Sequence, residues 1–286
     1  MSILQAGTIV TLDVENESPF GWFLTDGEEE VLLHRSEMTD DFDPDEPVEV
    51  FLFQDNLGRL AATMHKPIIT QDKYDWVEVV GVHEKLGVFV SIGLKKDVLV
   101  SVDDLPFMYS VRPIVGDRLY CTLVLDRNDR LFAKPATEDV MEKQFAKATK
   151  KDYNKDITGV VYRATKAGTF IITAEGYRGF VHDSERQVEP RLGQKVDGRI
   201  VDVKDDGSVN VSLLGRKQEV LQDDAEKIFA YLEQRGGSMP YGDKSLPEEI
   251  QTRFNLSKGA FKRALGKLMK EGRVYQEDNW THIKKD

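Results

Sequence analysis

The stretch AGTFIITAEGYRGFVHDS, residues 167–184, carries a pattern that occurs three times in this chain of 286 residues. Gly168 precedes Phe170 by two positions, and His182 follows the glycine by 14 residues. Around these positions apolar and polar residues alternate with a period of two, which is typical of short, half-buried β-strands. The other copies are FGWF with LLHRS in residues 20–36, and LGVF with LVS in residues 86–101.

Each copy continues through a polar stretch into two more short alternating segments. Five strands in about 65 residues are typical of a small closed barrel, which leaves no exposed sheet edge. We therefore predict a mainly β chain with some α structure, in which three five-stranded OB-fold barrels stand in tandem before a winged-helix domain. The predicted barrels are residues 1–66, 67–136 and 152–217, and the strand-poor residues 137–151 are predicted to form a connecting helix.

Residues 218–286 change to a helical period, as the spacing of Ala225, Ile228 and Leu232 indicates. A second helix is expected to begin at Ser245, with Leu246, Ile250 and Phe254 on its buried side. A third helix is expected between Ser257 and Gly272, and a hairpin over residues 274–283. Three helices followed by a hairpin predict a winged helix.

Several classes of protein are disfavoured by the composition. No segment approaches the roughly 18 apolar residues of a membrane helix, and the first residues lack a basic signal-peptide region. The single cysteine, Cys121, excludes an intramolecular disulfide and a cysteine-rich zinc site, so we expect a cytoplasmic protein. Nucleotide-binding and hydrolase motifs are absent and the five histidines are scattered, so no catalytic residue, metal or cofactor is expected.

The negative charge is concentrated at one end of the chain. The net charge is −11, but residues 1–66 alone hold 15 acidic and 3 basic residues. Residues 137–217 hold 13 acidic against 15 basic residues, and residues 218–286 hold 12 of each. The C-terminal half is therefore free to meet a polyanion, whereas the first quarter repels one.

The third predicted helix carries most of the candidate phosphate-binding residues. At 100° per residue from Lys258, three cations fall near 120–180°, opposite an apolar face that includes Phe261 and Leu265. Phosphate contacts from such a stripe would give salt-dependent binding with little sequence preference. The candidate cations are Lys258, Lys262, Arg263, Lys267, Lys270 and Arg273.

The repeated element resembles the RNA-binding repeat of ribosomal protein S-one, a subfamily of OB-folds. This resemblance implies that two phenylalanines and a histidine on the outer face stack unpaired bases. The third copy matches at Phe170 and His182, with Ala167 in place of the first aromatic residue, while the second copy keeps only Phe89. The first copy matches at Phe20, Phe23 and His34.

Three such repeats before a winged helix resemble the bacterial conserved virulence factor B family over nearly the whole chain. The resemblance implies an RNA-binding protein that regulates gene expression after transcription. Charge favours the third copy, because Arg163, Lys166 and Arg178 lie near its aromatic positions. We predict that single-stranded RNA binds mainly through the third barrel and the winged helix, with the first barrel as a secondary RNA site.

Two other functions remain open. The third helix could enter the major groove of DNA, as in a transcription regulator, although it has no Asn or Gln to read adenine. Alternatively, the acidic first barrel could dock a basic protein or a ribosomal surface, which would make the protein an adaptor. No dimerisation segment is visible, and a monomer is expected.

Overall fold

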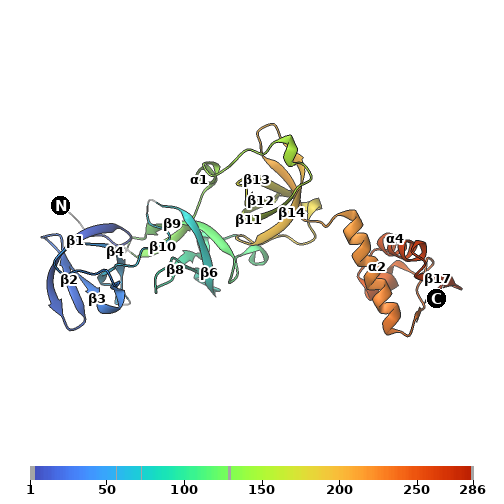
Figure 1. Ribbon diagram of the computed structural model, residues 1–286, viewed down its shortest axis with the longest axis horizontal. Helices are drawn as coiled ribbons and strands as arrows, with labels where there is room; N and C mark the ends of the chain where they lie inside the picture. Colours follow the sequence, from blue (N-terminus) through green and yellow to red (C-terminus); the bar gives the residue numbers. More distant parts are fainter. Residues whose placement is uncertain (1–3, 56, 72, 128–129, 285–286) are drawn as a thin grey trace. The chain divides into compact units, whose positions relative to one another are not determined.

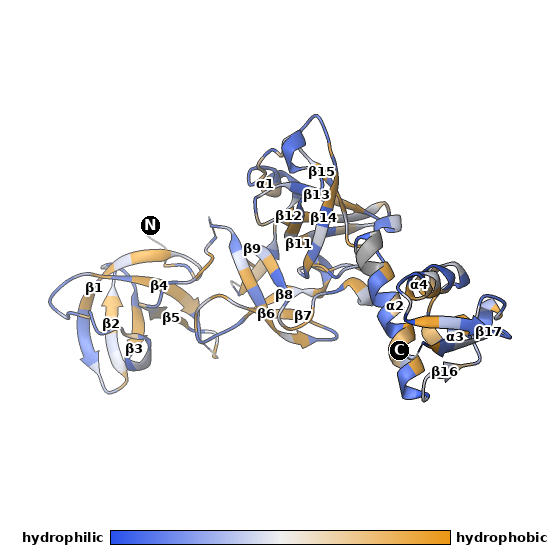
Figure 2. Ribbon diagram, turned by 45° about the vertical axis from the view of Figure 1, so that its right-hand side comes forward, coloured by the Kyte–Doolittle hydropathy of each residue, from blue (hydrophilic) through white to orange (hydrophobic). Residues whose placement is uncertain are grey.

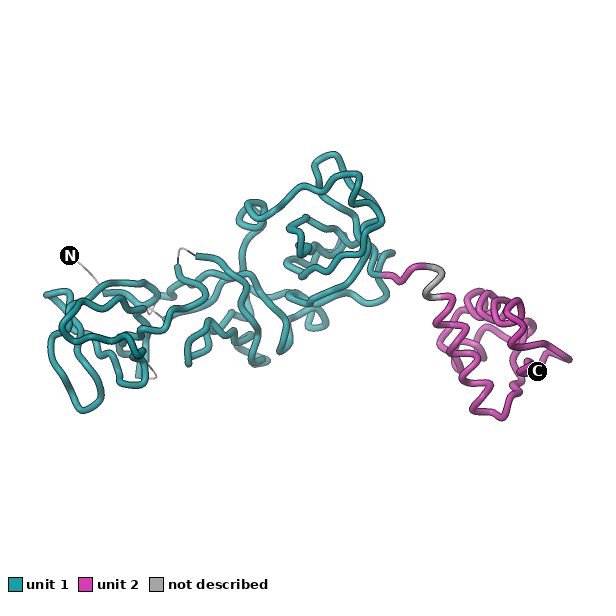
Figure 3. The backbone as a smooth tube through the Cα atoms, viewed as in Figure 1, with its two compact units in different colours: residues 1–213 teal, residues 214–286 magenta. Residues whose placement is uncertain are grey.

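Fifteen strands of the computed structural model close into three barrels, and the winged helix follows them, which confirms the predicted fold (Figure 1). The structure describes residues 4–55, 57–71, 73–127 and 130–284. Two units are distinguished, residues 1–213 with the barrels and residues 214–286 with the winged helix (Figure 3). No helix in the described ranges is long and apolar enough to cross a membrane.

The three barrels share one strand order, in which the first strand pairs with the second and fourth and the third pairs in parallel with the fifth. Barrel 1 consists of β1 (Ile9–Ser18), β2 (Gly21–Thr25), β3 (Glu30–His34), β4 (Val48–Gln54) and β5 (Leu60–Thr63). Barrel 2 consists of β6 (Asp75–His83), β7 (Gly87–Ser91), β8 (Val98–Ser101), β9 (Arg118–Leu125) and β10 (Leu131–Pro135). Barrel 3 consists of β11 (Asp156–Thr165), β12 (Gly168–Thr173), β13 (Arg178–His182), β14 (Lys195–Val203) and β15 (Val209–Ser212).

Figure 2 shows hydrophobic and hydrophilic segments along the strands of the barrels. The buried side chains of the three barrel cores are mostly aliphatic, as expected where alternate residues of a strand point inward. The repeated glycine begins the second strand of each barrel, where the strands approach closely. A Cβ at Gly168 would lie 2.5 Å from the carbonyl oxygen of Val181, and φ there is +153°. Equivalent collisions of 2.0 Å occur at Gly21 and Gly87, so the close approach of the backbone explains the repeated glycine.

The segment between barrels 2 and 3 differs from the predicted continuous helix over residues 137–151. Only α1 (Glu138–Glu142) is α-helical, and a single 3-10 turn follows at Lys150–Asp152. The intervening backbone bonds to barrel 3 instead, because the amides of Ala146 and Ala148 donate to the carbonyl oxygens of Gly176 and Gly207. Those contacts replace the i→i−4 bonds that a continuous helix would need.

The winged helix packs three helices on a three-stranded sheet of order β16-β18-β17. The second helix is capped at Leu246, one residue later than the predicted cap Ser245, because the Glu249 carboxylate accepts from the amide of Leu246, while the Ser245 hydroxyl accepts from that of Gly242. Leu246 is consequently 60% exposed, contrary to its predicted burial. The elements are α2 (Lys217–Gln234), β16 (Ser238–Met239), α3 (Pro247–Phe254), α4 (Lys258–Lys270), β17 (Val274–Glu277) and β18 (Trp280–Ile283).

Candidate nucleic-acid interface

Four aromatic side chains cross the outer face of barrel 3 in a continuous line. Phe170 on β12 and Phe180 on β13 are register partners, with ring centroids 5.1 Å apart. Tyr162 on β11 extends the line, 6.2 Å from Phe170, and His182 ends it, 6.4 Å from Phe180. We call these four residues the aromatic strip. His182 is exposed and the other three are half-buried, so the strip lies at the surface of the barrel.

A β-bulge in β11 places the side chains of Tyr162 and Arg163 at the aromatic strip. The pairing of β11 with β12 shifts between Val161 and Arg163, which leaves Tyr162 as the extra residue. Tyr162 and Arg163 therefore both lie beside Phe170, and the Arg163 guanidinium carbon is 5.7 Å from the Phe170 ring centroid. Neither Tyr162 nor Phe180 was predicted from the sequence. The bulge in β11 breaks the period of two at Tyr162, whereas Phe180 shares the outward face of β13 with His182 and does follow from the alternation.

The same bulge occurs in the other two barrels with different residues. The register shifts between Val14 and Asn16 in β1, and between Val79 and Gly81 in β6. Glu15 therefore stands in barrel 1, and Val80 in barrel 2, where barrel 3 has Tyr162. Barrel 3 alone combines an aromatic residue and a cation at this position.

Cations surround the strip at distances typical of cation–π contacts. The Arg178 guanidinium carbon lies 5.0 Å from the Phe170 centroid, and Lys204 Nζ lies 5.8 Å from the Phe180 centroid. Lys166 is exposed and forms no ion pair with a described residue. Of the predicted residues of barrel 3, Phe170, His182, Arg163 and Arg178 are therefore grouped around one aromatic surface, and in the described chain no ring contact joins Lys166 to it.

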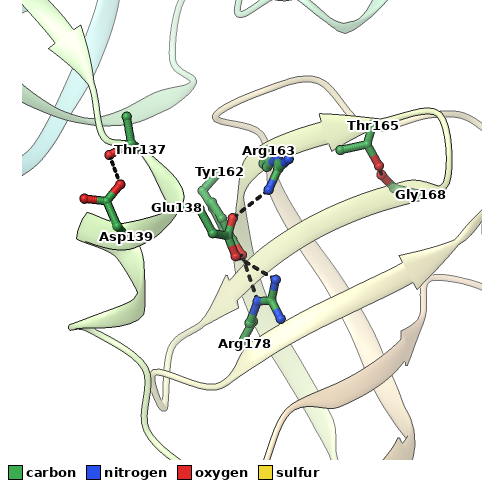
Figure 4. Close-up of polar contacts among 8 residues, drawn as sticks. All are labelled: Thr137, Glu138, Asp139, Tyr162, Arg163, Thr165, Gly168 and Arg178. Atoms are coloured by element: carbon green, nitrogen blue, oxygen red, sulfur yellow. Dashed lines mark hydrogen bonds and ion pairs between the residues drawn. The ribbon is translucent and has the colours of Figure 1, made fainter.

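Glu138 of α1 binds both predicted arginines of this surface (Figure 4). Its Oε2 lies 3.1 Å from Arg163 Nη1 and its Oε1 lies 2.6 Å from Arg178 Nη2. The Tyr162 hydroxyl donates to the same carboxylate at 3.1 Å, and burial raises the pKa of Tyr162 to about 12. A carboxylate thus occupies the position between two arginines that a phosphate group would fit.

The histidine position of the repeat also has a structural role. The Nδ1 atom of His182 accepts from the amide of Ser184 and so caps the 3-10 turn Asp183–Glu185. His34 caps the turn Arg35–Glu37 of barrel 1 in the same way, and Ser101 caps the corresponding turn of barrel 2. The cap explains why His or Ser recurs here, and it leaves the ring of His182 exposed.

The first two barrels present poorer surfaces for stacking. In barrel 1, Phe20 is 66% exposed, Phe23 is half-buried and His34 is exposed, but no ring contact joins them in the described part of the chain. In barrel 2, Phe89 is half-buried. It lines a cavity of about 370 Å³ together with Phe132 and, from barrel 1, Phe53.

The cations of α4 divide into two groups. Lys262, Arg263 and Lys270 are exposed. None of them has a side-chain nitrogen within 4.0 Å of a carboxylate oxygen of a described residue. Lys258, at the start of the helix, is half-buried and also lacks such a pair. The exposed cations are free to meet phosphate groups.

The other two predicted cations are engaged with neighbouring side chains. Lys267 is half-buried between Gln222 of α2 and Glu271. Arg273 donates two hydrogen bonds to Glu226 at 2.5 and 3.0 Å and lies over the Phe229 ring. These two cations hold α2 to the end of α4, a role that helical angles alone do not predict.

Family models match four segments of the chain. They are an S1 domain at residues 6–65, the CvfB first S1-like domain at 74–134, the second domain of virulence regulatory factor CvfB at 141–215, and a CvfB-like winged helix domain at 226–283. Each match falls on one of the four domains of the fold.

Individual relatives agree with these models. Uncharacterized protein YitL of Bacillus subtilis is 53% identical over 99% of this chain and 95% of its own length. Conserved virulence factor B of Staphylococcus haemolyticus is 40% identical over 85% of this chain and 82% of its own. The crystal structure of a multidomain protein with nucleic acid binding domains from Streptococcus pneumoniae is 34% identical, has a TM-score of 0.67 and covers 98% of both chains. With three S1-like barrels before a winged helix, the chain belongs to the CvfB family of virulence regulatory factors.

Proposed function

We propose that the protein is a non-enzymatic, cytoplasmic, single-stranded RNA-binding protein that regulates gene expression after transcription. Binding occurs mainly through barrel 3 and α4. The observation that carries this proposal is the aromatic strip with Arg163 and Arg178 beside Phe170. Aromatic rings on an OB-fold face stack unpaired bases, and nearby cations bind the phosphates that follow each base.

Three further observations support the choice of barrel 3 and α4. Barrel 1 has Glu15 at the bulge and lies in the segment with 15 acidic and 3 basic residues, which disfavours phosphate. Phe89 of barrel 2 faces a cavity between two barrels. The exposed cations Lys262, Arg263 and Lys270, which form no ion pair with a described residue, give the winged helix a surface for phosphates. A nucleic acid partner in general is also supported by the Streptococcus pneumoniae relative, which is described as a protein with nucleic acid binding domains.

The test uses the full chain and a fluorescent single-stranded RNA of about 15 nucleotides. Phe180→Leu removes one ring of the strip and should be well tolerated, because Leu32 and Leu99 occupy the same register position in barrels 1 and 2. Each stacked ring contributes about 1–3 kcal/mol, so Phe180→Leu should weaken binding roughly tenfold. Phe23→Leu is the control, because it makes the same substitution in barrel 1, at the register partner of Leu32, which has the place of Phe180.

The outcomes distinguish the competing functions. Loss of affinity with Phe180→Leu but not with Phe23→Leu supports RNA binding at barrel 3. Displacement of the RNA by duplex DNA would instead favour a DNA-binding regulator that uses α4. Failure of the full chain to bind either nucleic acid would leave the adaptor function of barrel 1.

A further inference from the structure

The outer face of the winged-helix sheet carries three aromatic rings that face away from the core. Val274 on β17 and Met239 on β16 point into the core, so the alternate residues face outward. Tyr275 is 45% exposed and Trp280 is 43% exposed. Tyrosine and tryptophan are enriched at interfaces, where the ring contacts a partner and the hydroxyl or N–H group forms a hydrogen bond.

The rings form an ordered surface. Tyr275 and His282 are register partners, with ring centroids 5.1 Å apart and planes 26° apart. Trp280 continues the row, 6.3 Å from His282 and with an interplanar angle of 15°. Nδ1 of His282 lies 2.8 Å from the Ser238 hydroxyl of β16, which fixes the middle ring. The near-parallel rings thus need little ordering when a planar ligand binds.

A lysine lies at each end of the hairpin that carries the rings. Lys284 lies two residues beyond His282, is exposed, and forms no ion pair with a described residue. Lys244 is exposed beside the turn of the hairpin, where its amide donates to Asn279 Oδ1 at 3.0 Å, and it likewise lacks an ion pair there. Glu277 is the register partner of Trp280 and lies beside that ring, and Asp278 lies in the turn of the hairpin.

We propose that Tyr275, Trp280 and His282 form a second base-stacking site, the wing platform, for unpaired nucleotides. This inference rests on the proposed function and adds a site distinct from the aromatic strip. The outward-facing residues of β17 and β18 include no aliphatic side chain, which disfavours an apolar protein partner. Bases of a duplex are already stacked on each other, so the platform selects single strands.

The platform and α4 belong to the same unit and complement each other. Only Glu271, Gly272 and Arg273 separate the last residue of α4 from β17. The phosphates of a single strand can contact the exposed cations of α4 while its bases stack on the rings of the platform. The winged helix would therefore bind single strands through stacking as well as through charge.

The test compares substitutions at position 280 in the full chain, with oligouridylate and oligoadenylate as probes. Trp280→Phe keeps a ring that can stack but removes the fluorescence of Trp280. The double variant Trp280→Val with Tyr275→Val removes both outer rings and puts in their place a residue that is favoured in strands. The double variant should bind about tenfold more weakly, with an unchanged salt dependence. Trp280→Phe should bind like the wild type, yet lose the part of the tryptophan quenching that comes from Trp280, since Trp76 beside Tyr162 can still respond to RNA at barrel 3.

Controls separate this inference from the proposed function. Trp22→Phe, in barrel 1, should retain the quenching. Normal affinity of the double variant, or quenching in Trp280→Phe as large as in the wild type, would overturn the wing platform while leaving the proposed function intact. Absence of RNA binding by the wild-type chain would overturn both. Circular dichroism of each variant checks that the fold is retained.

Discussion

Glu138 Oε1 lies 2.6 Å from Nη2 of Arg178, the arginine nearer to the Phe170 ring. The carboxylate belongs to the segment between barrels 2 and 3, and the arginine belongs to the surface proposed to bind RNA. Because the same carboxylate also binds Arg163, one residue neutralises both cations. An RNA phosphate that approaches the aromatic strip must therefore compete with Glu138.

Glu138→Gln should consequently raise the affinity for single-stranded RNA several-fold. The amide cannot neutralise two guanidinium groups, which then become available for phosphate. Each additional phosphate contact to a single strand should steepen the slope of log affinity against log salt by about 0.7. Titration of a labelled RNA at four salt concentrations measures both effects.

Asp139→Asn provides the matched control, since it removes the same charge from the next residue of α1. The Asp139 carboxylate is exposed and accepts from the Thr137 hydroxyl at 2.5 Å. If this variant bound RNA as tightly as Glu138→Gln, net charge rather than release of the arginines would be the cause. Weaker binding by Glu138→Gln would show that the carboxylate positions the arginines for RNA.

The two groups of α4 cations should behave differently. Lys262→Gln removes an exposed cation without an ion pair in the described chain, so it should weaken RNA binding and reduce the salt slope by about 0.7. Lys267→Gln removes a cation already engaged with Gln222 and Glu271, so it should change the slope little. Equal effects from the two substitutions would contradict the division.

The order of domains was predictable because it depends on local patterns. The repeated glycine, the period of two and the cap at Ser257 each reflect a local backbone requirement, and the structure confirms the barrels and the third helix. The candidate site was only partly predictable. Tyr162 reaches the strip through a bulge, and Glu138 reaches the arginines from another segment, so neither position follows from periodicity.

Reactivity of Cys121 should report opening of barrel 2. The residue is fully buried in the core of that barrel, and burial raises the pKa of its thiol far above the ordinary range. Because the thiolate is the reactive form, an aromatic disulfide reagent should modify the native chain very slowly. In urea one thiol per chain should react, and rapid reaction without urea would show that barrel 2 opens readily.

Asp152 should make the stability of barrel 3 depend on pH in the acid range. Its carboxylate accepts from Lys155 Nζ at 2.8 Å and from the amide and hydroxyl of Thr149 at 2.8 and 2.9 Å. These bonds lower the pKa of Asp152 from 3.8 to about 2. A depressed pKa in the folded state means that the stabilisation is present above pH 3.8 and is lost as the pH falls through about 2.

At pH 7, Asp152→Asn should therefore lower the urea midpoint of the unfolding transition that includes barrel 3. Hydrogen exchange identifies which transition this is. The difference from the wild type should stay constant down to about pH 5 and shrink as the pH approaches 2, because the wild-type carboxylate then becomes neutral as well. Asp205→Asn, an exposed carboxylate in the β14–β15 turn without a described partner, should leave the midpoint unchanged. A difference between Asp152→Asn and the wild type that persisted at pH 2 would mean that the asparagine disturbs the 3-10 turn itself, rather than removing a charge that Lys155 and Thr149 stabilise.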